Sequence, residues 1–268
     1  MDLGLNGKVA VVTGSTSGAG MTIARTLATE GARIIVHGRK RDAGQALVAE
    51  IEGSGGSAKL VLADLLDDDA MPAFGEEAIA AFGHVDILVC NAGRIGYYEG
   101  WDNVGAADWR AMYDGVALTV VRPINALRQH MAGLGWGRIV TIASAQGKQP
   151  FAMMPDYAVA KSAVIALTKS LSKALDRTGV LVNCISPGII VTDFIRQRLM
   201  EAAEKDGRST EWAHVEEWVL RHELDNPTGR LARPQDVADA VAFLASERAA
   251  YINGTNLMVD GGSVQTIW

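Results

Sequence analysis

The stretch VAVVTGSTSGAG, residues 9–20, decides the fold. It begins with a run of β-branched residues, continues as a glycine-rich turn, and leads at once into a helical pattern from Met21 to Glu30. Strand, glycine turn and helix in this order are the context of a dinucleotide site. Glycine lets the backbone approach a pyrophosphate closely, and the helix N-terminus offers free N–H groups to the anion. A plain tight turn between strand and helix is the alternative interpretation.

Further β-branched runs recur along the chain between longer helical segments. Most are apolar without alternation, which is typical of strands covered by helices on both faces. The alternating order of strands and helices therefore predicts an α/β fold, a doubly wound, parallel, seven-stranded Rossmann sheet with helices on both faces. The expected strands are Val9–Thr13, Arg33–His37, Lys59–Leu62, Val85–Cys90, Arg138–Ala143, Leu181–Ile185 and Asn256–Val259.

The chain shows no sign of a division into domains. No linker rich in Pro, Gly or Ser interrupts it, so residues 1–268 are expected to form a single domain. Residues 189–230 are long and charged, with apolar residues near helical spacing. Because this segment follows the sixth expected strand, we expect a substrate-binding flap over the carboxyl ends of the strands, where doubly wound folds bind ligands.

Composition excludes several classes of function. The formal charge is −6 and basic residues are scattered, which argues against nucleic acid as a partner. The two cysteines, Cys90 and Cys184, lie in or beside apolar runs, so we expect small core residues rather than a disulfide, and no metal site. The start of the chain lacks a signal-peptide pattern, and no apolar segment reaches the ~20 residues that span a bilayer. A cytoplasmic protein without membrane contact is expected.

A tyrosine and a lysine carry the candidate chemistry. Tyr157 and Lys161 are four residues apart on an expected helix, hence on one face, and Ser144 ends the fifth expected strand thirteen residues before Tyr157. Tyrosine has an ordinary pKa of about 10, so it exchanges protons near neutrality only where a cation favours the phenolate. A Tyr and Lys at this spacing occur by chance in many helices; the preceding serine makes the pattern specific.

Together these features resemble the short-chain dehydrogenase/reductase family, in the branch of the 3-oxoacyl-carrier-protein reductases. The glycines at 14, 18 and 20 match its T-G-x-x-x-G-x-G variant, Asn91-Ala92-Gly93 its N-A-G motif, and residues 187–192 its P-G-x-x-x-T segment. The resemblance covers Leu5 through Gly262. It implies a ketone and a secondary alcohol interconverted by hydride transfer, with Ser144, Tyr157 and Lys161 catalytic and Tyr157 as the acid/base.

The resemblance also implies a nicotinamide dinucleotide. Gly38 stands where members that select NAD carry an aspartate, and Arg39 follows it; a guanidinium matches a 2′-phosphate well, which favours NADP(H) over NAD(H). A solvated basic loop is the alternative interpretation. The implied cofactor contacts are Gly14, Thr16, Ser17, Gly18, Ala19, Gly20, Arg39, Asp64, Leu65, Asn91, Ala92, Gly93, Tyr157, Lys161, Pro187, Gly188, Ile190 and Thr192.

One position departs from the family pattern. Members usually carry an asparagine that holds a water in a proton path toward the lysine, and Val116 stands there. Asn125 lies on another face of the helix and does not replace it. Three interpretations follow: other groups hold the water, the proton leaves by another route, or turnover is low. Alternatives to the NADP(H) enzyme are an NAD-linked alcohol dehydrogenase and a nucleotide-binding protein with weak turnover.

The substrate is the least determined part of the sequence interpretation. The loops after the fourth to sixth expected strands should face the nicotinamide, with Arg94, Tyr97, Gln146, Met153 and Met154 as pocket candidates beside the flap. This mixture, apolar with few fixed charges, suggests a moderately sized apolar ketone or alcohol. The family resemblance further implies a homotetramer that pairs through two long helices and the last strand.

Overall fold

The computed structural model describes residues 2–96, 99–222 and 225–266 and confirms the predicted architecture. All seven strands are parallel and pair in the order β3-β2-β1-β4-β5-β6-β7. The chain reverses its direction of travel across the sheet between β1 and β4, so their carboxyl ends border a crevice. The strands are β1 Val9–Val12, β2 Arg33–Gly38, β3 Ser57–Leu62, β4 Ile87–Cys90, β5 Gly137–Ile142, β6 Val180–Pro187 and β7 Asn256–Val259.

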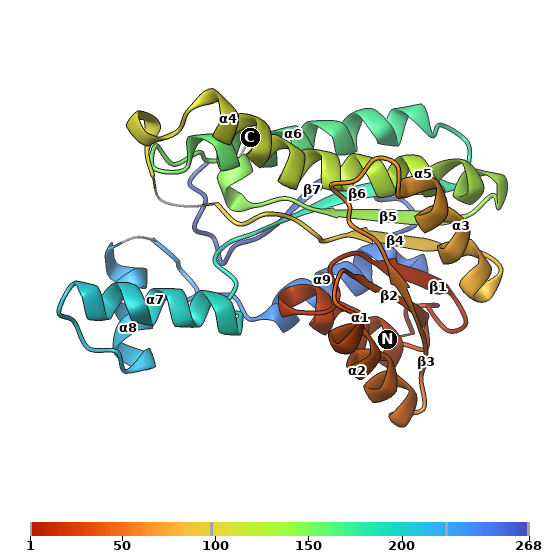
Figure 1. Ribbon diagram of the computed structural model, residues 1–268, viewed down its shortest axis with the longest axis horizontal. Helices are drawn as coiled ribbons and strands as arrows, with labels where there is room; N and C mark the ends of the chain where they lie inside the picture. Colours follow the sequence, from red (N-terminus) through yellow and green to blue (C-terminus); the bar gives the residue numbers. More distant parts are fainter. Residues whose placement is uncertain (1, 97–98, 223–224, 267–268) are drawn as a thin grey trace.

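Helices cover both faces of this sheet, as Figure 1 shows. One face carries α1, α2 and α9, and the other carries α3, α5 and α6, with α4 leading into α5 through a π-helical turn at Asp114–Leu118. Prolines lie in the first turns of α3, α6 and α9. Proline has no backbone N–H, and in the first turn this costs no intrahelical hydrogen bond. The bounds are α1 Gly18–Thr29, α2 Arg41–Gly53, α3 Met71–Phe82, α4 Ala106–Tyr113, α5 Thr119–Gly133, α6 Pro155–Ala174 and α9 Pro234–Ala245.

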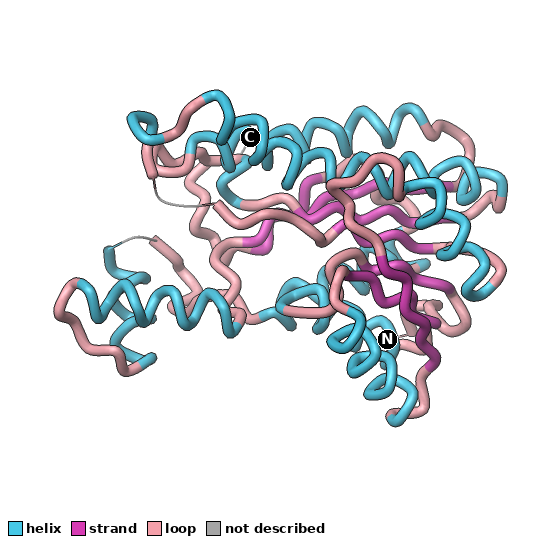
Figure 2. The backbone as a smooth tube through the Cα atoms, viewed as in Figure 1, coloured by secondary structure: helices cyan, strands magenta, loops and turns pink. Residues whose placement is uncertain are grey.

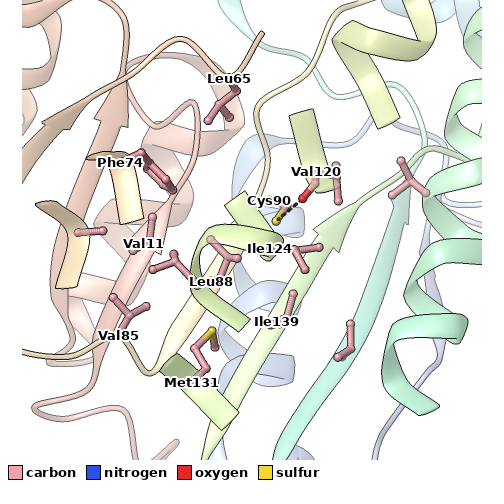
Figure 3. Packing of buried hydrophobic residues seen from close by; sticks show 14 of the residues in the cluster. Val11, Leu65, Phe74, Val85, Leu88, Cys90, Val120, Ile124, Met131 and Ile139 are labelled. Atoms are coloured by element: carbon pink, nitrogen blue, oxygen red, sulfur yellow. Dashed lines mark hydrogen bonds between the residues drawn. The ribbon is translucent and has the colours of Figure 1, made fainter. Parts of the chain in front are cut away.

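The side chains of successive strand residues pack into two separate hydrophobic cores, one on each face of the sheet. Val11 packs into the cluster under α3, α5 and α6, whereas Val12 packs into the cluster under α1 and α9, because neighbouring side chains of a strand point to opposite faces. Figure 3 shows part of the first cluster, in which the Cys90 thiol lies 3.9 Å from the Val120 carbonyl oxygen. Cys90 and Cys184 are both free and buried, so the expectation of small core residues is met.

The segment expected as a flap forms two helices, α7 Asp193–Lys205 and α8 Trp212–His222. They pack on each other beyond the edge of the layered body, at the left of Figures 1 and 2. Val215 and Val219 of α8 are buried. Within the described residues, no helix is long and apolar enough to cross a membrane.

Candidate active site

A cleft of about 1530 Å³ opens at the carboxyl ends of the strands. It exceeds the ~300–1,000 Å³ that a single small ligand usually occupies, so it has room for a dinucleotide and a substrate together. Most sequence-predicted site residues line it: Gly14, Thr16, Ser17, Gly18, Ala19, Arg39, Leu65, Asn91, Ala92, Gly93, Arg94, Ser144, Gln146, Met154, Tyr157, Lys161, Pro187, Gly188, Ile190 and Thr192.

Three predicted site residues do not line the cleft. Gly20 packs beneath the glycine turn, where a Cβ atom would lie 2.5 Å from the Gly14 carbonyl oxygen. Asp64 lies 3.7 Å from the Arg39 guanidinium. Met153 is half exposed, and its carbonyl accepts hydrogen bonds from the backbone N–H groups of Glu99 and Gly100. Tyr97 lies outside the described residues.

The turn after β1 has the conformation that its glycines permit. Gly14 and Gly18 adopt φ values of +66° and +56°, a region that other residues rarely enter. The lack of a side chain at Gly20 lets α1 begin directly against the turn. The first N–H groups of α1 therefore face the cleft without an obstructing side chain, which is the arrangement a pyrophosphate requires.

Asn91 and Thr13 fasten the ends of β1 and β4 to each other. The Asn91 amide donates to the carbonyl oxygen of Thr13 at 3.0 Å, and the Thr13 hydroxyl oxygen accepts from the N–H groups of Asn91 and Ala92, also at 3.0 Å. Asn91 thus positions the glycine turn through its side chain. Its backbone, with that of Ala92, remains as cleft wall.

His37 is a site residue to which the sequence assigned no role. It lines the cleft at the end of β2, and its Nδ1 accepts a hydrogen bond of 3.2 Å from the Gly14 N–H. Burial lowers the pKa of His37 to about 4, so the ring is neutral near pH 7 and can accept this bond. His37 could have been assigned to the site only from the pairing of β2 with β1, which places it beside the glycine turn. That pairing is known once the strand order is known.

Gly38 and Arg39 define the far end of the cleft. A Cβ atom on Gly38 would lie 2.5 Å from the Thr16 side chain, so Thr16 occupies the space that an aspartate at this position would enter. Arg39 is 70% exposed in its side chain and lines the cleft beside Thr16. This end is therefore open to an anion and offers no carboxylate at position 38.

Ser144, Tyr157 and Lys161 meet at the centre of the cleft. Tyr157 and Lys161 project from α6, with the Lys161 Nζ 5.7 Å from the centre of the Tyr157 ring. Lys161 Nζ donates to the carbonyl oxygen of Ile142 at 2.8 Å, which fixes it beneath the end of β5. Ser144 follows β5, and its Oγ accepts from the Gln146 N–H at 3.2 Å. The structure thus brings together the three residues that the sequence spacing singled out.

Burial shifts the pKa values of Tyr157 and Lys161 in the directions that favour the neutral form of each side chain. Desolvation raises the pKa of Tyr157 to about 12, and a hydrogen bond with Ser144 opposes that rise. Desolvation lowers the pKa of Lys161 to about 8. A charge on Lys161 therefore lies in a poorly solvated place, where electrostatic interactions are weakly screened. The trio has the groups needed to donate a proton to an oxygen or to remove one from it.

Val116 is buried in the apolar cluster under α5 and α6, within the π-helical turn. Its neighbour Asp114 pairs with Arg122 at 2.8 Å and so does not substitute for the missing asparagine. Asn125 bonds with Arg128 at the surface. The turn also directs the Gly115 carbonyl toward the loop after β4, where it accepts from the Arg94 N–H at 2.7 Å.

Other residues that line the cleft were not among those named from the sequence. Gln149 and Phe151 follow the Ser144 turn, and Ser263, Val264 and Gln265 follow β7. The last three could have been anticipated, because all parallel strands end at the same edge of the sheet.

Comparisons with known proteins agree with this geometry. Residues 14–264 match the family model described as enoyl-(acyl carrier protein) reductase. The chain is 35% identical to the 3-oxoacyl-(acyl-carrier-protein) reductase of Escherichia coli, over 97% of this chain and 98% of the relative. It is 36% identical to the cis-4-hydroxycyclohexanecarboxylate dehydrogenase of Sinomonas cyclohexanicum, over 95% and 96%. The structure of L-sorbose reductase from Gluconobacter frateurii, complexed with NADPH and L-sorbose, superposes with a TM-score of 0.93 at 33% identity and complete coverage of both chains.

Proposed function

Because the chain belongs to the short-chain dehydrogenase/reductase family, we propose that it is an NADP(H)-dependent oxidoreductase that interconverts a ketone and a secondary alcohol, with Tyr157 as the acid/base. One observation carries the proposal. Tyr157 and Lys161 lie side by side in a cleft that also contains the glycine turn, so a proton donor and a dinucleotide site share one space.

The three polar side chains would divide the proton transfer between them. A nicotinamide held by the cleft would supply the hydride to the carbonyl carbon of a ketone, or accept it from the carbinol carbon of an alcohol. The Ser144 hydroxyl, which hydrogen-bonds with Tyr157 and accepts from the Gln146 N–H, would turn to donate to a substrate oxygen and hold it near Tyr157. Tyr157 then gives its proton to the nascent alkoxide, or removes one in the direction of oxidation, while the Lys161 cation stabilises the phenolate.

Arg39 supports NADP(H) over NAD(H). A guanidinium at the open end of the cleft matches the 2′-phosphate, and Thr16 fills the space of the alternative carboxylate. Arg39→Ala should raise the Kd for NADPH about 10-fold, because the arginine is exposed, and leave the Kd for NADH within twofold. Lys40→Ala, in the next position, is the matched control. Equal losses for NADPH and NADH would contradict the assignment.

Steady-state oxidation of NADPH across a panel of ketones tests the proposed activity. We expect turnover of at least one ketone class. Tight NADPH binding without turnover of any ketone or alcohol would instead favour the second candidate, a nucleotide-binding protein, for which the buried apolar Val116 is the supporting observation. Turnover with NADH at equal efficiency would favour the NAD-linked dehydrogenase.

A further inference from the structure

We propose that Gln146 and Gln149 form an amide pair that selects the substrate by donating hydrogen bonds to its oxygen atoms. The substrate class is then a ketone, or its alcohol, that carries further oxygen acceptors as hydroxyl or carboxylate groups, rather than the apolar ketone suggested by the sequence. This inference rests on the proposed function and narrows it.

The orientation of the Gln146 amide follows from its backbone partner. Its Oε1 accepts from the Phe151 N–H at 2.9 Å. A backbone N–H only donates, so the oxygen must face it and the Nε2 group must point elsewhere. Gln146 lines the cleft, and within the described residues its Nε2 has no hydrogen-bond partner.

The same reasoning orients Gln149. Its Oε1 accepts from the Gln265 N–H at 2.8 Å. Gln265 belongs to the segment after β7, which the Asp260 carboxylate holds in place by accepting from the N–H of Val264 at 2.8 Å. The Gln149 Nε2 is likewise without a partner in the parts of the chain that the structure describes, and the residue lines the cleft.

The Gln146 and Gln149 side chains both belong to the turn after Ser144, the residue proposed to bind the substrate carbonyl oxygen. Gln146 donates its own N–H to the Ser144 Oγ at 3.2 Å, and the Gln149 N–H donates to the Ala145 carbonyl at 2.9 Å. The amides therefore share a rigid turn with the serine that would bind the substrate carbonyl. Oxygen atoms near the ketone of a bound substrate are the groups that they are placed to meet.

Energetics make such a pair selective. An apolar ketone that filled this part of the cleft would remove water from both Nε2 groups and leave them without acceptors. Burying a polar group without a hydrogen-bond partner is unfavourable. Sites built to hydrogen-bond a substrate group therefore reject analogues that lack it. Met154 and Phe151, from the same wall, supply apolar contact for the carbon skeleton.

The test compares three ketone probes. Cyclohexanone has no second acceptor, 4-oxocyclohexanecarboxylate adds a carboxylate, and L-sorbose adds hydroxyl groups. Each is measured with the wild type and with the double variant Gln146→Met, Gln149→Met. Gln235→Met, on the outer surface of α9, is the matched control. Melting temperature and NADPH Kd establish that each variant folds and binds cofactor.

We expect the wild type to prefer at least one oxygenated ketone to cyclohexanone in kcat/KM. The double variant should lose that preference by about 10- to 100-fold, mainly through KM, while cyclohexanone changes by less than threefold. Gln146→Glu keeps the oxygen that accepts from the Phe151 N–H but adds a negative charge. If the substrate acceptor is a carboxylate, kcat/KM for 4-oxocyclohexanecarboxylate should fall. If the acceptor is a hydroxyl group, kcat/KM for L-sorbose should be retained.

Two outcomes would overturn the inference: a wild type that treats all three probes alike, or a double variant that loses activity equally on all of them. Calorimetry of probe binding to the NADPH complex measures the preference for oxygenated ketones over cyclohexanone as a ratio of Kd values, without turnover. If no ketone is turned over but the oxygenated probes still bind through the amides, the proposed function fails and the amide site stands.

Discussion

Lys161 shows how a buried residue sets the chemistry of its neighbour. Burial holds the pKa of Tyr157 at about 12, so the phenolate that alcohol oxidation requires is scarce near pH 7 without a cation beside it. Lys161 is the buried cation on the same helix, and its own pKa is lowered to about 8. The acid/base role proposed for Tyr157 therefore requires the cation of Lys161.

Replacing this cation should change the pH dependence of oxidation. Lys161→Met removes the charge that favours phenolate, so the pKa of Tyr157 rises and the kcat/KM profile for alcohol oxidation moves to higher pH. At pH 7 we expect a loss of at least about 100-fold. Lys173→Met, farther along α6 and exposed, is the control. An unshifted profile for the Lys161 variant would remove Lys161 from the mechanism.

His37 makes stability depend on pH. Its pKa is about 4 in the folded protein against 6.5 for the unconstrained ring, so between these values the unfolded chain binds more protons. The free energy of unfolding must then fall as pH drops through this window, by about 2 kcal/mol between pH 7 and pH 5 from His37 alone.

Urea unfolding at the two pH values checks this. His37→Asn should lose that part of the pH dependence, whereas His214→Asn, at an exposed position, should keep it. A wild type and a His37 variant with the same change in unfolding free energy would show that the ring titrates normally in the fold.

Individual residues differed in how far the sequence could place them. Tyr157 and Lys161 were placed correctly, because one helix turn joins them. His37 and Gln149 were not, because their partners, Gly14 and Gln265, lie 23 and 116 positions away along the chain. Contacts of that kind follow from strand order and from the path of the last residues, which local patterns do not contain.

At the level of elements, the π-helical turn and the N-A-G loop enclose the space beside Lys161. A methyl group placed on Gly93 would lie 3.9 Å from the Lys161 Nζ and 3.8 Å from the Gly115 carbonyl oxygen, with no closer contact. Alanine therefore fits without a clash. It would fill the space through which a water could carry a proton to the lysine in the absence of an asparagine at position 116.

Gly93→Ala should consequently lower kcat by about 10-fold, an effect within the usual size of general acid–base contributions. Because Gly93 is also an implied cofactor contact, the NADPH Kd is measured beside kcat. The control is Gly133→Ala at the end of α5, where a methyl group meets nothing within 4 Å. Stopped-flow traces with NADPH provide both quantities. Unchanged turnover would place the proton route elsewhere.

The elements themselves were largely predictable from hydrophobic runs and turn residues. Strand ends moved by a few residues, for example to Ser57 at the start of β3, because pairing with β2 continues beyond the apolar run. The π-helical turn was not predicted, since it depends on packing between α5 and α6 rather than on a local pattern. Residues 189–230 had near-helical spacing and proved to contain α7 and α8.

For the whole molecule, the parallel, doubly wound sheet followed from the alternation of strands and helices, whereas the strand order and the reversal between β1 and β4 came from the structure. The cleft did not follow so directly, because it combines five loops, the flap and the residues after β7. Their meeting depends on the three-dimensional path of each loop. This is why the predicted site was nearly complete at the glycine turn and sparse around the substrate.

The sheet also ends in an edge that suggests assembly. All four residues of β7 are only partly buried, and among the residues that the structure describes this strand pairs with β6 alone. An unpaired edge strand is a natural surface for association. We therefore propose a homotetramer, and sedimentation velocity at micromolar concentration should show a species of four chains. A monomer at that concentration would contradict this.

The central claim is that Tyr157 transfers the proton in a hydride-transfer reaction. The most direct test of this role is single-turnover reduction of a ketone substrate by enzyme-bound NADPH in the Tyr157→Phe variant. The control variant is Tyr113→Phe, because Tyr113 is exposed on α4. We expect Tyr157→Phe to bind NADPH normally and to lose at least about 100-fold in the rate of NADPH oxidation, and Tyr113→Phe to match the wild type. A Tyr157→Phe variant that reduces the ketone at the wild-type rate would contradict the account.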